Sequence, residues 1–599
     1  MKSEKIIIVG GGSAGWMTAS TLIRHYPGKE IILLEDPDTP TVGVGESTLG
    51  HFNDFLASLD LKDEDWMPYC NASYKNSIKF TDWKHENSGS FHYPFGGYDT
   101  SNSNFGIMDW FLLKLKNGDK WDDNHFAKVH TSVVEMCDAN KYNDNSDGSI
   151  PNYNPEIDTA YHLDAALFGE FLKNKFCLPR GVQYISDKYE KPIMDDHNFV
   201  HSIVTKSGMI IDGDLFIDCT GMRSLLLEGI YDVPFISFND TLLNDRAIAT
   251  QLPYIDKEVE LEPVTNSTAI ESGWCWNIPL WSRVGSGYVY SSKFATEDEA
   301  EEQFKKYLTS NKMPLGDTEE GKSRVDEATF KHIKIRHGYH EQPWVNNVCA
   351  IGMSIGFIEP LESTGLLLWH EAIKMLTDSL HRPIVTKYDR QTFNVNMRHT
   401  LEGFFTFISY HYSNSMRSDT PYWWHVTQEV DYFEPTKSLI EGQLGTSDNI
   451  TAAALAKLRE HEYPISLGGV NYISAGMGQT PVTQHSLHRR KLTTLQSTTL
   501  DNITLGDIVV DKGDATHFTG GAPGVQTFEG VDLPDNIIET IMKPADKERY
   551  VQILSDTEVA WGEKLAFQQQ LAEDSPTLYR YLKDRFYPDV GETECKSID

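Results

Sequence analysis

A glycine-rich turn near the N-terminus carries the first residues that could hold a ligand. Gly10-Gly11-Gly12-Ser13-Ala14-Gly15 fits the pattern G-x-G-x-x-G, and it follows the apolar run Ile6–Val9. A second apolar run begins at Ile31 and ends at Glu35. Such glycines let the backbone approach a pyrophosphate at a helix N-terminus, and an acidic residue about 20 positions later binds a ribose hydroxyl. This order of elements predicts a site for FAD or NAD, whereas a purely structural glycine turn would leave Glu35 unexplained.

Two tryptophans lie close together in the segment Gly273-Trp274-Cys275-Trp276-Asn277-Ile278-Pro279-Leu280. Residues i and i+2 of a strand face the same way. Trp274 and Trp276 could therefore form an apolar wall beside a flavin, which would keep an organic substrate from touching it. For these two residues alone, a core strand with two large side chains is an equally good interpretation.

The pattern Trp-x-Trp-x-Ile-Pro is typical of flavin-dependent halogenases, and the chain resembles the tryptophan-halogenase family as a divergent member. Further segments that resemble family motifs occur in the family's order over about 360 residues: Val42–Thr48 (VGVGEST), Asn76–Phe80 (NSIKF), Tyr161–Ala165 (YHLDA) and Gly356–Gly365 (GFIEPLESTG). The resemblance weakens after about residue 425.

The resemblance implies an FADH2-dependent halogenase, which uses oxygen and a halide ion (bromide, chloride or iodide) to make hypohalous acid. It implies that Lys79 relays this oxidant to an electron-rich aromatic substrate of the indole or phenol type. Apolar neighbours of Lys79 such as Ile78 and Phe80 could tune the pKa of its amine. Hydrogen bonding to the oxidant and conversion to a haloamine both remain open. Glu362 is implied beside Lys79, where it would stabilise positive charge on the ring; only the motif register selects it over Glu359.

The remaining site residues follow from the same resemblance. Besides the glycine turn and Glu35, it implies cofactor contacts at Glu46, Ser47, Met353 and Leu366. Backbone N–H groups of Thr364 and Gly365 would hold the halide, because the start of a helix binds anions. The substrate candidates are His92, Phe404 and Tyr410, for which a polar loop (His92) and a plain hydrophobic core (Phe404, Tyr410) are alternatives.

The chain departs from the family in one segment. Members that act on free tryptophan carry a tyrosine-rich helix that grips both ends of the amino acid, but the corresponding stretch, Thr451–Tyr463, has no paired tyrosines. We therefore expect an aromatic substrate other than free tryptophan.

The expected fold is α/β with α+β insertions. A glutathione-reductase-like FAD-binding Rossmann module covers residues 1–390, since apolar runs before Thr220-Gly221 and Met353 read as returning strands. A mostly helical substrate module covers 391–599, with a loop-rich segment around 485–529. No second nucleotide motif is visible, so a separate NAD(P)H-dependent flavin reductase is the implied partner.

Composition excludes several classes of function. The chain of 599 residues has 53 Lys and Arg against 87 Asp and Glu, a net charge of −34 that excludes nucleic acid as a partner. No apolar run approaches the ~20 residues of a membrane span. Seven scattered cysteines without a CxxC pair predict a reducing, cytoplasmic location and no metal site. Homo-oligomerisation stays open.

Two alternatives to a halogenase remain. An FAD-dependent aromatic-ring monooxygenase would need its substrate against the flavin, which a wall of Trp274 and Trp276 would prevent. A non-enzymatic flavin-binding redox protein would leave Lys79 and Glu362 without a task.

Overall fold

The chain divides into two units, within each of which the elements pack on one another. The computed structural model describes residues 3–39, 43–96, 123–141, 153–382, 384–433, 435–437, 467–478, 499–500 and 503–504. Unit 1 comprises Met1–Lys79, Pro94–Gly96 and Glu135–Phe405, and unit 2 comprises Phe80–Tyr93, Gly97–Val134 and Thr406–Asp599. The division falls inside helix α14 (Lys387–Asn414) rather than at residue 390, and unit 2 also takes two earlier segments.

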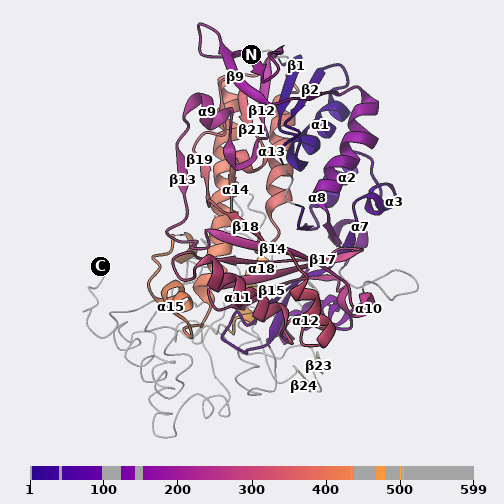
Figure 1. Cartoon of the computed structure of the whole chain (residues 1–599), viewed down its shortest axis with the longest axis vertical. Helices are drawn as coiled ribbons and strands as arrows, with labels where there is room; N and C mark the ends of the chain where they lie inside the picture. The colour runs from indigo at the N-terminus through magenta and orange to yellow at the C-terminus, as the bar shows by residue number, and fades with distance from the viewer. Residues whose placement is uncertain are drawn as a thin grey trace, which may run out of the picture. The chain divides into compact units, whose positions relative to one another are not determined.

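A six-stranded sheet in the order β20-β21-β12-β1-β2-β8 forms one part of unit 1 (Figure 1). Its strands are β1 (Lys5–Val9), β2 (Glu30–Glu35), β8 (Gln183–Ser186), β12 (Leu215–Asp218), β20 (Trp344–Val345) and β21 (Val348–Ala350). β1 pairs in parallel with β2 and β12, and β12 in parallel with β21. Helix α1 (Ser13–His25) joins β1 to β2 and packs against α13 (Gly365–Ser379). This is the predicted Rossmann-type α/β fold.

A mostly antiparallel sheet forms a second part of unit 1. Its unit 1 strands run in the order β18 (Lys331–Lys334), β14 (Arg246–Pro253), β17 (Arg283–Tyr290), β16 (Gly273–Pro279), β15 (Val264–Ile270) and β5 (Ser77–Thr81). α11 (Glu297–Leu308) and α12 (Glu319–Asp326) pack against this sheet (Figure 1). Cys275 joins Tyr288 and Phe304 in the core beneath α11. Because strand residues alternate between faces, Trp274 and Trp276 point away from that core.

A small sheet in the order β3-β7-β4 brings distant segments together. β7 (Ala160–Leu163) is buried along its whole length and pairs on one side with β3 (Glu46–Ser47) and on the other with β4 (Ser73–Lys75). His162 stands opposite both Ser47 and Ser73 in these ladders. The sheet thus places side chains from three parts of the sequence next to one another.

Shorter elements complete unit 1. They are α2 (Phe52–Ser58), α3 (Asp63–Trp66), α7 (Pro155–Asp158), α8 (Ala165–Phe171), a π-helix at Leu172–Cys177, α9 (Leu227–Tyr231), α10 (Lys257–Glu260), β9 (Tyr189–Met194), β10 (Val200–Thr205), β11 (Ile210–Asp212), β13 (Phe235–Ser237), β19 (Gly338–His340), β22 (Gly356–Phe357) and 3-10 turns at Met67–Tyr69, Leu178–Arg180, Gly221–Arg223 and Gly352–Ser354. α6 (Val133–Asp138), β6 (Ser90–Pro94) and the end of β5 cross between the units.

Unit 2 has an aromatic core. Its described elements include α5 (His125–His130), the end of α14, α15 (Pro421–Gln428), α18 (Leu467–Gly476), β23 (Thr499–Leu500) and β24 (Ile503–Thr504). Trp83 packs against Tyr412 and Trp423, with ring centroids 5.3 and 5.7 Å away. The segments 451–463 and 485–529 lie outside the described residues. Within the described ranges, no helix is long and apolar enough to cross a membrane.

Two ion pairs of α12 differ in burial and allow a test of the packing of unit 1. Arg324 pairs with Glu260, and both side chains are almost fully buried, whereas Lys322 pairs with Glu319 on the surface. We expect Arg324→Met to lower the free energy of unfolding by about 3–5 kcal/mol, because it leaves a buried carboxylate without its cation. Lys322→Met should leave the free energy of unfolding nearly unchanged, because water screens this surface pair. Urea denaturation measures both, and equal losses would contradict this packing.

Candidate functional site

A cleft of ≈ 760 Å³ opens in unit 1 where the carboxyl ends of β1, β2 and β12 meet the second sheet. The predicted site residues that line it are Gly10, Gly12, Ser13, Ala14, Glu35, Glu46, Ser47, Trp274, Trp276, Met353, Thr364, Gly365 and Phe404. Gly15 and Leu366 lie behind this lining: a Cβ at Gly15 would be 2.0 Å from the Gly10 carbonyl oxygen, and Leu366 is buried in α13. Ligands of open α/β sheets bind at such strand ends.

The glycine turn leaves room for a phosphate-bearing ligand. Gly10 has a φ of +116°, and a Cβ there would lie 2.2 Å from the carbonyl oxygen of Cys219. A Cβ at Gly11 would collide with the Glu35 carboxyl group, whereas Gly12 has nothing within 4 Å. The backbone N–H groups at the start of α1 therefore face open space, with Glu35 at the end of β2 beside them. These residues fit the pyrophosphate and ribose of FAD.

The two tryptophans form one face of the cleft, as their spacing predicts. Their ring centroids are 6.1 Å apart. The Trp274 indole donates a hydrogen bond to the Glu359 carboxylate at 3.1 Å, and the Asn244 amide donates to the same oxygen at 2.9 Å. A Cβ at Gly287 would lie 2.1 Å from the Trp276 ring, so this glycine makes room for the indole. Glu359 thus holds the wall in place.

The interactions of Lys79 are with groups other than Glu362, next to which the sequence-based prediction places it. Lys79 is half-buried on β5, where its charge acts on the Glu262 carboxyl and the Cys137 thiol. Burial raises the pKa of Glu262, and the charge of Lys79 partly opposes that rise. The two lysines lie in different sheets because β4 ends just before Asn76 and β5 begins just after it. Lys75 therefore belongs to the small sheet and Lys79 to the large one.

Lys75 takes the position expected for Lys79. Its amine is fully buried at the end of β4 and donates hydrogen bonds to the Thr48 carbonyl at 2.9 Å and the Ser363 hydroxyl at 2.8 Å. The Phe95 ring centroid lies 4.9 Å from the nitrogen. Burial holds the pKa of Lys75 well below its ordinary value, and the charge of Glu362 partly opposes this lowering. Composition alone gave no signal to choose this lysine over Lys79.

Ser363 reaches Lys75 from a strained turn. Its φ of +58° lies in the left-handed region, which a residue with a Cβ rarely adopts. Glu362 before it is buried, while Thr364 and Gly365 after it line the cleft at the start of α13. The turn therefore joins the lysine to the cleft within four residues, and strain of this kind is common at functional sites.

Glu46 lines the cleft on β3 next to another carboxylate. Burial raises the pKa of Glu46 from 4.5 to about 7, and the charge of Asp164 adds to the rise. Asp164 itself forms an ion pair with Arg283 at 2.8 Å. Near neutral pH, Glu46 can thus carry a proton that an exposed glutamate would have lost.

Two of the predicted substrate contacts belong to unit 2, where each is buried. The backbone N–H of His92 donates to the Asn124 side chain at 2.7 Å. The Tyr410 hydroxyl forms a hydrogen bond with Ser474. The third candidate, Phe404, belongs to unit 1 and lines the cleft.

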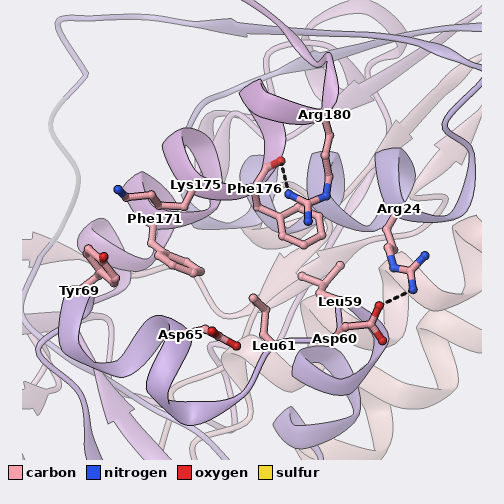
Figure 2. A pocket seen from close by; sticks show the side chains of 10 residues that line it. All are labelled: Arg24, Leu59, Asp60, Leu61, Asp65, Tyr69, Phe171, Lys175, Phe176 and Arg180. Atoms are coloured by element: carbon pink, nitrogen blue, oxygen red, sulfur yellow. Dashed lines mark hydrogen bonds and ion pairs between the residues drawn. The ribbon is translucent and has the colours of Figure 1, made fainter.

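A second pocket in unit 1, of ≈ 550 Å³, contains none of the predicted site residues (Figure 2). Both arginines of this pocket have partners within it. Arg24 pairs with Asp60 (Figure 2). Arg180 lies 3.8 Å from the Phe176 ring centroid and donates a hydrogen bond to the Phe176 carbonyl at 3.0 Å (Figure 2). We assign this pocket no part in the site.

Comparison with known proteins points to one family. The sequence profile described as tryptophan halogenase matches residues 5–474. The chain is 36% identical over 443 residues to tryptophan 6-halogenase SttH of Streptomyces toxytricini, covering 70% of this chain and 80% of that protein. The solved apo structure of VirX1 is 42% identical with a TM-score of 0.71, covering 80% and 90% of the two chains. Tar14, a tryptophan C-6 flavin-dependent halogenase from taromycin biosynthesis, is 31% identical with a TM-score of 0.69, covering 80% and 91%.

The glycine turn gives a test of the cofactor cleft. We expect Gly10→Ala to weaken FAD binding at least roughly tenfold, about 1.4 kcal/mol, because the added Cβ forces the turn away from its left-handed conformation. Gly28→Ala adds a methyl group in open space in the same β1-α1-β2 unit and should leave affinity unchanged. Flavin fluorescence quenching measures both, and equal affinities would contradict the assignment.

The raised pKa of Glu46 predicts a pH dependence of stability. The folded chain keeps this proton between pH 4.5 and about 7, so the contribution of Glu46 to stability falls as the pH rises through that interval. In the cofactor-free chain, Glu46→Gln should therefore match the wild type at pH 4.5 and be more stable by about 1–3 kcal/mol at pH 8. Glu64→Gln, at an exposed position of α3, should show no such difference. Urea unfolding at the two pH values decides.

Proposed function

The chain belongs to the tryptophan halogenase family, and we propose on that premise that it makes hypohalous acid from FADH2, oxygen and a halide ion, which Lys75 delivers to an electron-rich aromatic ring. Flavin-dependent halogenases of this family are oxidoreductases that halogenate aromatic substrates. One observation carries the proposal: the buried amine of Lys75 donates a hydrogen bond to Ser363. Ser363 belongs to the same turn as Glu362 and as Thr364 and Gly365, which line the cleft.

The cleft residues are suited to keep the flavin and the substrate apart. When bound there, FADH2 would give two electrons to oxygen, which takes its other two electrons from the halide ion. Trp274 and Trp276 line the cleft, and such an apolar wall would keep an organic substrate from touching a flavin bound there. The N–H groups of Thr364 and Gly365, at the positive end of the α13 dipole, are suited to hold the halide ion.

Lys75 is suited to accept the halogen. A lowered pKa increases the fraction of neutral amine, which is the nucleophilic form. Reaction of that amine with hypohalous acid forms an N–halogen bond and releases water. The N–halogen bond then breaks as the halogen bonds to the ring. The Glu362 carboxylate stabilises the positive ring intermediate, and the departing ring proton restores the N–H bond of Lys75.

The proposal also includes the class of substrate and the source of reduced flavin. The absence of paired tyrosines in residues 451–463, which lie outside the described residues, supports an indole or phenol other than free tryptophan. SttH and Tar14 are named as tryptophan halogenases, so free tryptophan is the comparison substrate. A separate NAD(P)H-dependent flavin reductase is the expected partner.

The two lysines four residues apart provide a matched pair of variants. With FAD, NADH, a flavin reductase, oxygen and bromide, we expect Lys75→Ala to lower halogenated product by roughly 100-fold or more, the scale of losing a group that acts in the transition state. Flavin reoxidation should continue at the wild-type rate, because the cofactor cleft is intact. Lys79→Ala should retain activity within about twofold.

Mass spectrometry of the products distinguishes the outcomes. Halogenation that survives Lys75→Ala but not Lys79→Ala would return the delivery role to Lys79. A hydroxylated product formed without halide would instead favour the aromatic-ring monooxygenase.

A further inference from the structure

A continuous row of hydrogen bonds leads away from the Lys75 amine inside unit 1. The amine donates to the Ser363 hydroxyl at 2.8 Å, and Ser363 donates to the Ser47 hydroxyl at 3.1 Å. The Ser47 and Thr265 hydroxyls are 2.7 Å apart, and Thr265 lies 2.8 Å from Nε2 of His162. These five residues come from five separate segments of the sequence. The row joins the lysine to a histidine that the halogenation chemistry described above does not use.

The environment of His162 fixes which ring nitrogen carries the proton in the neutral state. The Ser73 hydroxyl donates its hydrogen to the Pro279 carbonyl and lies 3.4 Å from Nδ1 of His162. Because that hydrogen is already used, Ser73 can only accept from Nδ1–H. The Nε2 lone pair is therefore free to accept a hydrogen bond from Thr265.

One direction of donation follows for the whole row. Since Thr265 donates to His162, its oxygen accepts from Ser47, whose oxygen in turn accepts from Ser363. Ser363 then accepts from Lys75, as the geometry of the amine requires. Each hydroxyl both accepts on the lysine side and donates on the histidine side. This is the arrangement in which one proton can pass along the row by successive short transfers.

Among the described residues, the Lys75 amine has no other hydrogen-bonded route for a proton. Its second hydrogen bond goes to the Thr48 carbonyl, which accepts but cannot pass a proton on. Lys75 and His162 are both fully buried, and the three hydroxyl residues are at most 7% exposed. The row of hydroxyls is thus the connected path within this buried site.

We propose that His162 receives the proton of Lys75 through Ser363, Ser47 and Thr265, and that this relay produces the neutral amine that takes the halogen. In the step, one N–H bond of Lys75 breaks, each hydroxyl passes one proton on, and an N–H bond forms at Nε2 of His162. The amine then reacts with hypohalous acid, forming the N–halogen bond and water. This inference rests on the proposed function.

The protonation of Lys75 and the protonation of His162, at the two ends of the row, depend on each other through their charges. Burial lowers the pKa of both groups; the charge of Glu362 partly opposes this at Lys75, and the positive charge of Lys75 adds to it at His162. A proton on one group therefore disfavours a proton on the other. Once the proton has left Lys75, the repulsion that disfavours it on His162 is gone.

Two substitutions interrupt the relay in different ways. Thr265→Val removes the central hydroxyl with little change in shape, and His162→Gln keeps an acceptor for Thr265 but cannot take up a proton. Thr265→Ser restores the hydroxyl. Thr250→Val is the matched control, because Thr250 is a buried threonine of the same sheet whose hydroxyl donates to the Thr329 carbonyl outside the row.

The direct readout uses the cofactor-free chain. Hypobromous acid is added over a pH series, and peptide mass spectrometry measures bromination at Lys75. In Thr265→Val and His162→Gln, we expect the initial rate of bromination at Lys75 near neutral pH to fall roughly tenfold, because the ammonium loses its proton more slowly without the relay. Thr265→Ser and Thr250→Val should follow the wild type.

Steady-state kinetics of the loaded enzyme provide the second readout. We expect Thr265→Val to lower kcat roughly tenfold with KM and FAD affinity within about twofold, and to make a curved proton inventory linear. If both interrupting variants match Thr250→Val, or if Thr265→Ser fails together with Thr265→Val, the relay is refuted. The proposed function would stand in that case, because it is tested separately by Lys75→Ala and by the dependence of the product on halide.

Discussion

The burial of one amine is the constraint on which the rest of the site depends. An isolated ammonium inside a protein costs several kcal/mol unless hydrogen-bond partners and charges compensate it. The small sheet β3-β7-β4 and the turn at Ser363 provide these partners for Lys75, with Glu362 as the compensating charge. The left-handed backbone of Ser363 costs roughly 1 kcal/mol or more, and it aims the hydroxyl at the lysine.

A single segment links the cofactor cleft to that amine. Glu359 holds the Trp274 indole, Ser363 contacts Lys75, and Thr364 and Gly365 face the cleft. The same seven residues therefore contribute to the wall, to the delivery group and to the predicted halide site. Because the segment is short and buried, a shift at one of these points would displace the others. This explains in physical terms why the Glu-Pro-Leu-Glu-Ser-Thr-Gly pattern occurs as a unit.

The local features of the site could be predicted from sequence, and the long-range ones could not. The cofactor site at the glycine turn and Glu35 could be predicted because strand, turn, helix and strand follow one another along the chain. The choice between Lys75 and Lys79 depended on where one strand ends and the next begins, and apolar neighbours favoured the less buried lysine. The row of hydroxyls could not be predicted from sequence, because its serines and threonine lie far apart along the chain and come together only when the small sheet forms.

The most direct test of the account bypasses the flavin. Hypobromous acid supplied to the cofactor-free chain with an indole should give one dominant bromoindole isomer if Lys75 handles the oxidant. Lys75→Ala should give the same mixture of isomers as hypobromous acid without protein, while Lys79→Ala should keep the dominant isomer. A dominant isomer that persists in Lys75→Ala would contradict the assignment of Lys75 as the group that delivers the halogen.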